Sequence, residues 1–128
     1  RSPQWTGGGV VFAPKPRDYS MKMNKREKQI AMKSALTSKV QDAKLVVVDA
    51  FNLDEIKTSK FVQILDNLKA PKALVVTKDK DEKVVLSARN IPTVKTTMTN
   101  SLNVYDILKY DSLVLTKDAV AAIEEVYA

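Results

Sequence analysis

The feature of this sequence that most constrains its fold is a regular alternation of short β-branched runs with segments of helical periodicity, which starts at residue 44. Four runs predict strands: KLVVVDA (44–50), ALVVTKD (73–79), TVKTT (93–97) and SLVLT (112–116). An amphipathic segment follows each run. Because such alternation is typical of parallel sheets with helices on both faces, we expect a three-layer α/β/α domain with a four-stranded, mainly parallel sheet.

Local signals refine the first half of this pattern. The run 44–50 is continuously apolar, which predicts a strand buried on both faces. A helix is expected over residues 58–70, with Thr58 and Ser59 as candidate N-caps. A second helix is expected over residues 81–89, and Asn90 is the candidate left-handed residue that ends it.

The second half of the pattern predicts two more helices. Asn103 is expected to cap a helix that runs to Lys109. The last helix is expected from about residue 117, with Val120, Ile123 and Val126 spaced for burial against the sheet.

The N-terminal segment differs in kind from this domain. Residues 1–20 contain the only tryptophan and all three glycines of the chain, and they show no helical or strand periodicity. We therefore expect an extended basic N-terminal arm over residues 1–20 and a globular α/β domain over residues 21–128. That domain would begin with a basic helix over residues 24–41.

The predicted helix 24–41 has an unusual distribution of side chains. Asn24 and Glu27 have the spacing of a capping box. Small residues recur with helical spacing on one side, and two basic residues lie nearly opposite to them. The small stripe consists of Ala31, Ser34, Ala35 and Ser38, and the basic residues are Arg26 and Lys33. The pattern predicts close packing on one side and contact with phosphates on the other.

Positive charge is concentrated at the N-terminal end. Residues 1–44 contain ten lysines and arginines against three acids, a net charge of +7. The remaining 84 residues contain eleven bases and twelve acids, a net charge of −1. This asymmetry favours a polyanionic partner for the N-terminal end, and nucleic acid in particular.

Composition excludes several kinds of chemistry. The chain has no cysteine and no histidine, which removes disulfides, thiolate and imidazole metal ligands, and histidine-based catalytic groups. Gly7, Gly8 and Gly9 do not form a Walker loop, because VVFAPKP follows them in place of a lysine and a helix. No apolar run approaches the roughly 20 residues that a membrane helix needs. We expect a cytoplasmic protein without a membrane partner.

One catalytic alternative stays open at this point. Asp49 ends the first predicted strand, and Asp79 follows the second. If the two strands are neighbours, these carboxylates could hold Mg²⁺, with Lys78 or Lys117 near a phosphate. This alternative is a magnesium-dependent nucleotide-handling α/β enzyme.

RNA binding agrees better with the composition of the arm. Glycine lets the backbone approach ribose and phosphate closely, and Trp5 can stack on an unpaired base. Arg1, Lys15 and Arg17 can neutralise phosphates. A segment of this kind orders on its partner rather than on its own domain.

Several blocks of the sequence resemble a known family. RSPQWTGGGVVFAPKPRDYS, KREKQIAMKSALTSK, LVVVDAF, VLSARNIPTVK and LNVYDILKYDSLVLTKDAV occur in this order. Together they resemble the universal L-four family of large-subunit ribosomal proteins, in its bacterial form and over its C-terminal portion. The resemblance implies a non-catalytic protein without cofactor, metal or small-molecule substrate. It implies binding to 23S ribosomal RNA and to neighbouring ribosomal proteins, a role in early subunit assembly, and a place near the peptide exit tunnel.

The resemblance also implies which residues contact RNA. Residues 1–20 would be the returning arm of a loop that penetrates the ribosomal RNA. The expected RNA-binding residues are Arg1, Ser2, Gln4, Trp5, Gly7, Gly8, Gly9, Lys15, Arg17, Lys22, Lys25, Arg26 and Lys33. Arg89 and Asn90 match the family pattern too, either as RNA contacts or as residues that hold a loop of the domain itself.

Overall fold

Four strands form the central sheet of the computed structural model, which describes residues 1–127. They are β1 (Leu45–Val48), β2 (Ala73–Thr77), β3 (Lys95–Met98) and β4 (Ser112–Thr116). Their order across the sheet is β1-β4-β2-β3, and all three neighbouring pairs are parallel. The prediction of a four-stranded parallel sheet is therefore confirmed.

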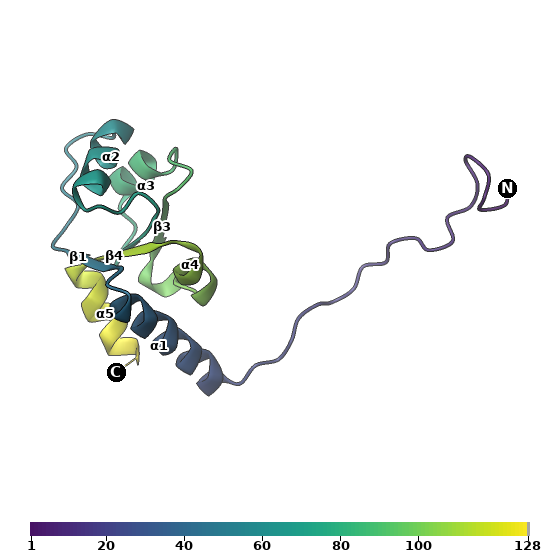
Figure 1. The fold of residues 1–128 in the computed structure, drawn as a ribbon, viewed down its shortest axis with the longest axis horizontal. Helices are drawn as coiled ribbons and strands as arrows, with labels where there is room; N and C mark the ends of the chain where they lie inside the picture. The colour runs from purple at the N-terminus through teal and green to yellow at the C-terminus, as the bar shows by residue number, and fades with distance from the viewer. Residues whose placement is uncertain (128) are drawn as a thin grey trace.

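Helices cover both faces of the sheet, as Figure 1 shows. α2 (Thr58–Asn67) and α3 (Glu82–Ala88) pack on one face. α1 (Lys25–Gln41), α4 (Val104–Lys109) and α5 (Lys117–Tyr127) pack on the other, and a short 3-10 helix, η1 (Thr99–Ser101), follows β3. The three-layer α/β/α prediction is confirmed.

Side chains that alternate along the central strands build two separate cores. On β4, Val114 enters the core under α2 and α3, while Leu113 and Leu115 enter the core under the other helices. Phe61 of α2 and Ile107 of α4 are fully buried centres of the two cores. Alternation of this kind follows from the twofold period of a strand.

The prediction that β1 is buried on both faces is wrong. β1 is an edge strand that pairs only with β4, and Val47 is 52% exposed. A continuous run of β-branched residues indicates a strand in apolar surroundings, but it does not distinguish an edge strand from a central one. β1 is short, which limits the unpaired edge that it presents.

Two predicted helix signals differ from the structure at α2. Thr58 is the first helical residue, and Lys57 holds the N-cap position without a side-chain cap. The helix ends at Asn67 rather than near residue 70, because Lys69 adopts a left-handed conformation with φ 53°. The N–H of Ala70 then donates to the carbonyl oxygen of Leu65 at 3.0 Å, which closes the end of the helix.

The predicted left-handed stop at Asn90 is also wrong. Within residues 1–127, only Ala43 and Lys69 among the residues other than glycine have positive φ. α3 instead ends in a right-handed turn, in which the N–H of Ile91 donates to the carbonyl oxygen of Ala88 at 2.9 Å. At the start of α3, Asp81 supplies the N-cap, because its side chain accepts from the backbone N–H groups two and three residues further on.

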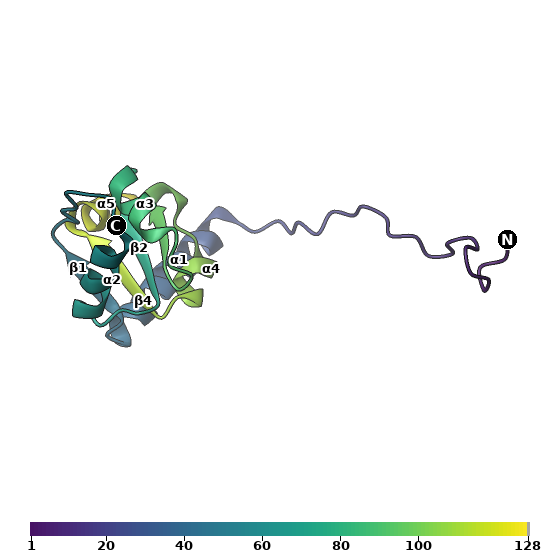
Figure 2. The same cartoon turned by 90° about the horizontal axis from the view of Figure 1, so that it is seen from above.

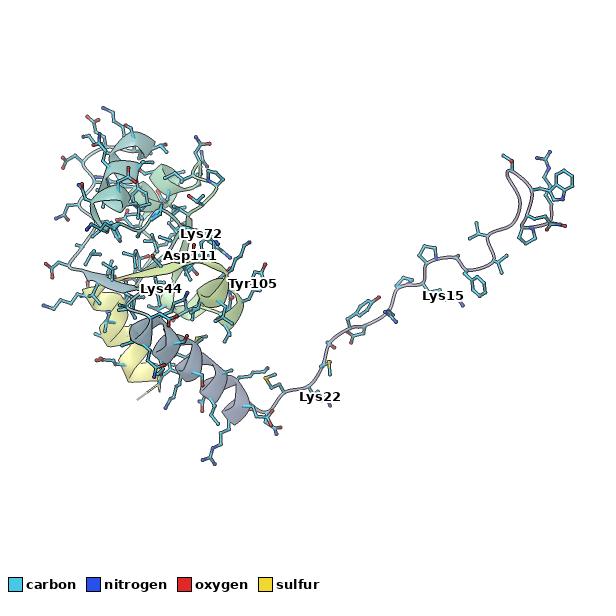
Figure 3. All side chains as sticks on the ribbon, viewed as in Figure 1. Lys15, Lys22, Lys44, Lys72, Tyr105 and Asp111 are labelled. Atoms are coloured by element: carbon cyan, nitrogen blue, oxygen red, sulfur yellow. The ribbon has the colours of Figure 1, made fainter. Side chains whose placement is uncertain are left out.

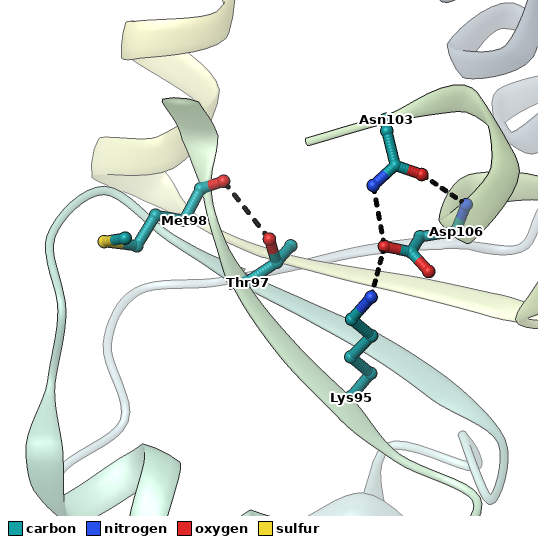
Figure 4. Close-up of polar contacts among 5 residues, drawn as sticks. All are labelled: Lys95, Thr97, Met98, Asn103 and Asp106. Atoms are coloured by element: carbon teal, nitrogen blue, oxygen red, sulfur yellow. Dashed lines mark hydrogen bonds and ion pairs between the residues drawn. The ribbon is translucent and has the colours of Figure 1, made fainter. Parts of the chain in front are cut away.

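The predicted cap of α4 is confirmed, and it forms part of a larger polar cluster (Figure 4). The side-chain oxygen of Asn103 accepts from the N–H of Asp106 at 2.8 Å. The Asp106 carboxylate accepts from the Asn103 amide at 2.8 Å and from the ammonium group of Lys95 at 2.6 Å. α4 is thereby joined to β3, which lies at the far edge of the sheet.

Burial along α5 and α1 only partly follows the predictions. In α5, Val120, Ile123 and Tyr127 are half-buried against the core, but Val126 lies off this face of the helix and is 66% exposed. In α1, the small stripe is split. Ala35 is buried, Ala31 and Ser38 are half-buried and Ser34 is exposed, while the larger Met32 and Leu36 complete the packing face.

Candidate nucleic-acid interface

Residues 1–24 form no helix or strand, and they extend away from the domain in both views (Figures 1 and 2). All of these residues except Gly8 are exposed. The exposed side chains include three aromatic residues, of which Phe12 is 94% exposed, Tyr19 73% and Trp5 67%. Large apolar side chains in such a position bury nothing against their own domain, which is typical of a surface that binds a partner.

The far end of this segment is ordered by its own backbone. Residues 1–9 fold back on themselves, so that the N–H of Gly9 donates to the carbonyl oxygen of Arg1 at 3.2 Å. Inside this loop, the N–H of Trp5 donates to the carbonyl oxygen of Ser2 at 3.1 Å and the N–H of Gly8 donates to that of Trp5 at 2.8 Å. We call residues 1–9 the tip loop. Trp5 is the middle residue of the tip loop, and its indole is exposed.

A second locally ordered site lies midway along the arm. The guanidinium group of Arg17 lies over the ring of Tyr19, 4.1 Å from its centroid. Asp18 accepts hydrogen bonds from the backbone N–H and the hydroxyl of Ser20, both at 2.8 Å. These bonds, the backbone one first, lower the pKa of Asp18 below its ordinary value. The carboxylate is held by its own turn, and the cation of Arg17 stays exposed.

The basic residues expected to meet phosphates are all exposed. Lys15 lies on the arm and Lys22 lies between the arm and α1, both well apart from the sheet (Figure 3). Lys25, Arg26 and Lys33 lie on α1, whose start is fixed by hydrogen bonds from the backbone and side chain of Asn24 to Glu27. The predicted pairing of Asn24 with Glu27 is thus confirmed.

The structure adds candidates that sequence reasoning missed. Lys28 is exposed on α1 among the predicted bases, and its position in the same helical turn as Lys25 would have indicated it. Phe12 and Tyr19 are exposed aromatic residues on the arm. The sequence signal that would have indicated them is that neither residue belongs to an apolar stripe of a predicted helix or strand.

Lys39 has the opposite role to the other bases of α1. Its side chain is buried, and its ammonium group donates to the carbonyl oxygen of Tyr110 at 2.8 Å and to that of Asp111 at 3.1 Å. These are backbone acceptors at and after the end of α4. Lys39 therefore holds α1 against α4 and is not available to a phosphate.

The carboxyl edge of the sheet does not support the alternative magnesium site. Asp49 and Asp79 line one hollow, together with Asp81 and Asp118. The strands that end in Asp49 and Asp79 are not neighbours, however, because β4 lies between β1 and β2. Within residues 1–127, no three acidic side chains are grouped closely enough to hold a metal ion.

Arg89 and Asn90 are both exposed just after α3. Neither is buried against a loop of the domain, and both side chains are accessible to a partner.

Among the helices described over residues 1–127, none is long and apolar enough to cross a membrane.

Comparison with known proteins agrees with this geometry. A family model described as the ribosomal protein L4/L1 family matches residues 1–126. The large ribosomal subunit protein uL4 of Lachnoclostridium phytofermentans is 70% identical to the chain, that of Agathobacter rectalis 71% and that of Clostridium botulinum 55%. Each of these matches covers 100% of this chain and 62% of the relative, so the chain spans about three fifths of their length.

Proposed function

The chain belongs to the ribosomal protein L4/L1 family, and from this premise we propose that it is a structural component of the large ribosomal subunit that binds 23S ribosomal RNA. In this proposal the protein is not an enzyme and uses no cofactor, metal or small-molecule substrate. It acts in the cytoplasm within the ribosome, beside neighbouring large-subunit proteins. It supports early assembly and the region of the peptide exit tunnel.

The exposure of the arm is the observation that carries this proposal. Residues 1–24 hold aromatic and basic side chains that contact nothing in the domain, although exposed rings such as Phe12 and Trp5 are costly to leave in water. RNA offers both partners that this composition needs, namely base faces for the rings and phosphates for the cations. A protein surface would need a matching excess of acidic side chains to neutralise the net charge of +7 on residues 1–44.

The proposed contacts divide into two groups by position. The tip loop and arm would lie against RNA, with Trp5 stacked on an unpaired base and with Arg17 and Tyr19 offering a preformed pair. The first half of α1 would lie against phosphates, because Arg26 and Lys33 are two helical turns apart on one side. The proposed RNA-binding residues are Arg1, Ser2, Gln4, Trp5, Gly7, Gly8, Gly9, Lys15, Arg17, Lys22, Lys25, Arg26 and Lys33.

The boundary between arm and domain fits this division. Residues 1–20 would serve as the arm that enters RNA, and residues 21–128 as the globular domain that stays outside it. The basic helix α1 joins the two parts, and its buried Lys39 anchors it to α4. An arm that becomes ordered by RNA would then be held at one end by a rigid element.

Limited proteolysis tests the proposal directly. Trypsin cleaves after Arg17 and Lys22, which are exposed in the free protein. We expect rapid cleavage there without RNA, and protection when transcribed 23S ribosomal RNA is present. 16S ribosomal RNA at the same salt and mass concentration serves as the control for nonspecific coating. Equal cleavage with and without 23S RNA, or protection in the free protein, would contradict the proposal.

A further inference from the structure

We propose that Gly8 is a positioning residue that acts through Trp5, because it allows the tip loop to close and to present the indole ring for stacking on a base. This inference rests on the proposed RNA-binding function and deepens it. It assigns to Gly8 a role within the protein itself, in addition to its place in the proposed contact surface.

The packing around Gly8 leaves no room for a side chain. Gly8 is the one residue of the segment 1–24 that is not exposed. A Cβ atom added there would overlap the carbonyl oxygen of Ser2 and would lie 2.8 Å from that of Trp5. Both neighbours are backbone atoms, which cannot move aside without opening the loop.

The same position also carries a hydrogen bond that defines the loop. The N–H of Gly8 donates to the carbonyl oxygen of Trp5 at 2.8 Å, and the next residue, Gly9, donates to that of Arg1 at 3.2 Å. Displacement of Gly8 to make room for a Cβ atom would break the first bond and misalign the second. The turn that holds Trp5 would then lose its shape.

The two neighbouring glycines provide an internal comparison. A Cβ atom added to Gly9 would meet only the carbonyl oxygen of Arg1 at 3.8 Å, which is ordinary van der Waals contact. Gly7 has φ 70°, so a substitution there is strained by the backbone rather than by crowding. Gly9→Ala is therefore a matched control for the shape of the tip loop in the free protein, since it adds the same methyl group one residue away.

A closed tip loop would increase affinity by preorganisation. Binding of a flexible segment costs the entropy of ordering it, and that cost falls when the bound shape already exists. Residues 1–9 have such a shape, whereas the following residues 10–17 have no backbone hydrogen bonds of this kind within the described chain. Gly8 would therefore raise the affinity for RNA by fixing the position of Trp5 before RNA binds.

A double-mutant cycle on binding to transcribed 23S ribosomal RNA tests this inference. Trp5→Ala is expected to weaken binding by about fivefold or more, as removal of a stacked base does. Gly8→Ala should weaken binding by a similar factor. The double variant Trp5→Ala with Gly8→Ala should bind as Trp5→Ala does, because Gly8 acts through Trp5.

Two further readouts keep the outcomes distinct. Trp5 is the only tryptophan, so quenching of its fluorescence by acrylamide reports the loop in free protein, and Gly8→Ala should change it while Gly9→Ala does not. Thermal unfolding of the domain should be the same in all variants. If wild-type protein binds RNA but Gly8→Ala binds as tightly as wild type, or if Gly8→Ala adds fully to Trp5→Ala, the inference is overturned. If wild-type protein does not bind 23S RNA, the proposed function itself is overturned, whatever the quenching shows.

Discussion

The ammonium group of Lys39 lies 2.8 Å from the carbonyl oxygen of Tyr110, so a base from the most positive part of the sequence is buried inside the domain. This hydrogen bond joins α1, the helix that continues the arm, to the end of α4. It separates the bases of α1 into one that holds the fold and others that face solvent. Mutations on the same helix should therefore affect two different properties.

Replacement of Lys39 by methionine should destabilise the domain and leave RNA binding almost unchanged. The variant keeps a similar volume but leaves the carbonyl oxygens of Tyr110 and Asp111 without their donor, at a cost of about 1–3 kcal/mol. Urea unfolding followed by circular dichroism measures this change in stability. Lys33→Met, on the exposed side of α1, should change stability by less than about 0.5 kcal/mol and should weaken RNA binding instead. Equal stability of Lys39→Met and wild type would contradict the structural role.

The ion pair of Asp106 with Lys95 should make stability depend on pH in the acid range. The hydrogen bond from Lys95 lowers the pKa of Asp106 below its ordinary value, an effect that outweighs the opposing effect of burial. The stabilisation is present above the ordinary value of about 4 and is lost as pH falls through the lower folded pKa. Asp106→Asn should be less stable at pH 7 by about 1 kcal/mol, because Lys95 is half exposed and its pairing is partly screened.

Urea titrations at a series of pH values below 5 check this prediction. Wild type should lose more stability than Asp106→Asn as pH falls from 5 to 2. Parallel curves for the two proteins would show that Asp106 does not contribute its charge to the folded state. Asp111→Asn is the control, since its pair with Lys72 is long and exposed.

Ser87→Ala should stabilise the domain. Ser87 is fully buried in α3, and within residues 1–127 its hydroxyl oxygen has no hydrogen-bond partner. Removal of an unsatisfied buried hydroxyl should raise the free energy of unfolding by about 1 kcal/mol. Thermal unfolding of the variant against Ser101→Ala, which changes an exposed serine, measures the difference. A destabilised Ser87→Ala would mean that the hydroxyl makes a stabilising interaction.

Asp49→Asn should have little effect, and Mg²⁺ should not stabilise the domain through this residue. A bound ion would raise the unfolding midpoint by mass action, and removal of a ligand would abolish that shift. Asp49 is exposed after an edge strand, so we expect a change below about 0.5 kcal/mol with or without millimolar Mg²⁺. A magnesium-dependent midpoint that Asp49→Asn abolishes would revive the enzymatic alternative.

Local patterns predicted which elements form, because strand and helix periods depend on nearby residues. The cap at Asn103 and the pairing of Asn24 with Glu27 were confirmed on this basis. Strand order depends instead on pairing between distant segments, so β1 was wrongly placed in the interior. The same error made the strands that precede Asp49 and Asp79 look like neighbours, although β4 lies between them.

The features of the candidate interface also differ in whether nearby or distant residues determine them. The exposure of Trp5 agrees with a sequence that offers it no apolar stripe to join. The burial of Lys39 was not predicted, since only the position of the α4 terminus supplies its carbonyl partners. Gly8 was interpreted only as a surface for ribose, because its crowding by Ser2 and Trp5 exists only in the closed loop.

The salt dependence of binding to 23S ribosomal RNA tests the central claim most directly. The variant Arg17→Ala, Lys22→Ala, Lys25→Ala, Arg26→Ala removes four exposed bases between the end of the arm and the first turn of α1. If these bases neutralise phosphates, the slope of log affinity against log salt should fall by about one unit for each base that neutralises a phosphate in the wild type. The variant Lys60→Ala, Lys78→Ala, Lys80→Ala, Lys117→Ala removes the same charge from the exposed surface of the domain and should keep nearly the full slope. Affinity and slope that are unaltered in the first variant would contradict the account.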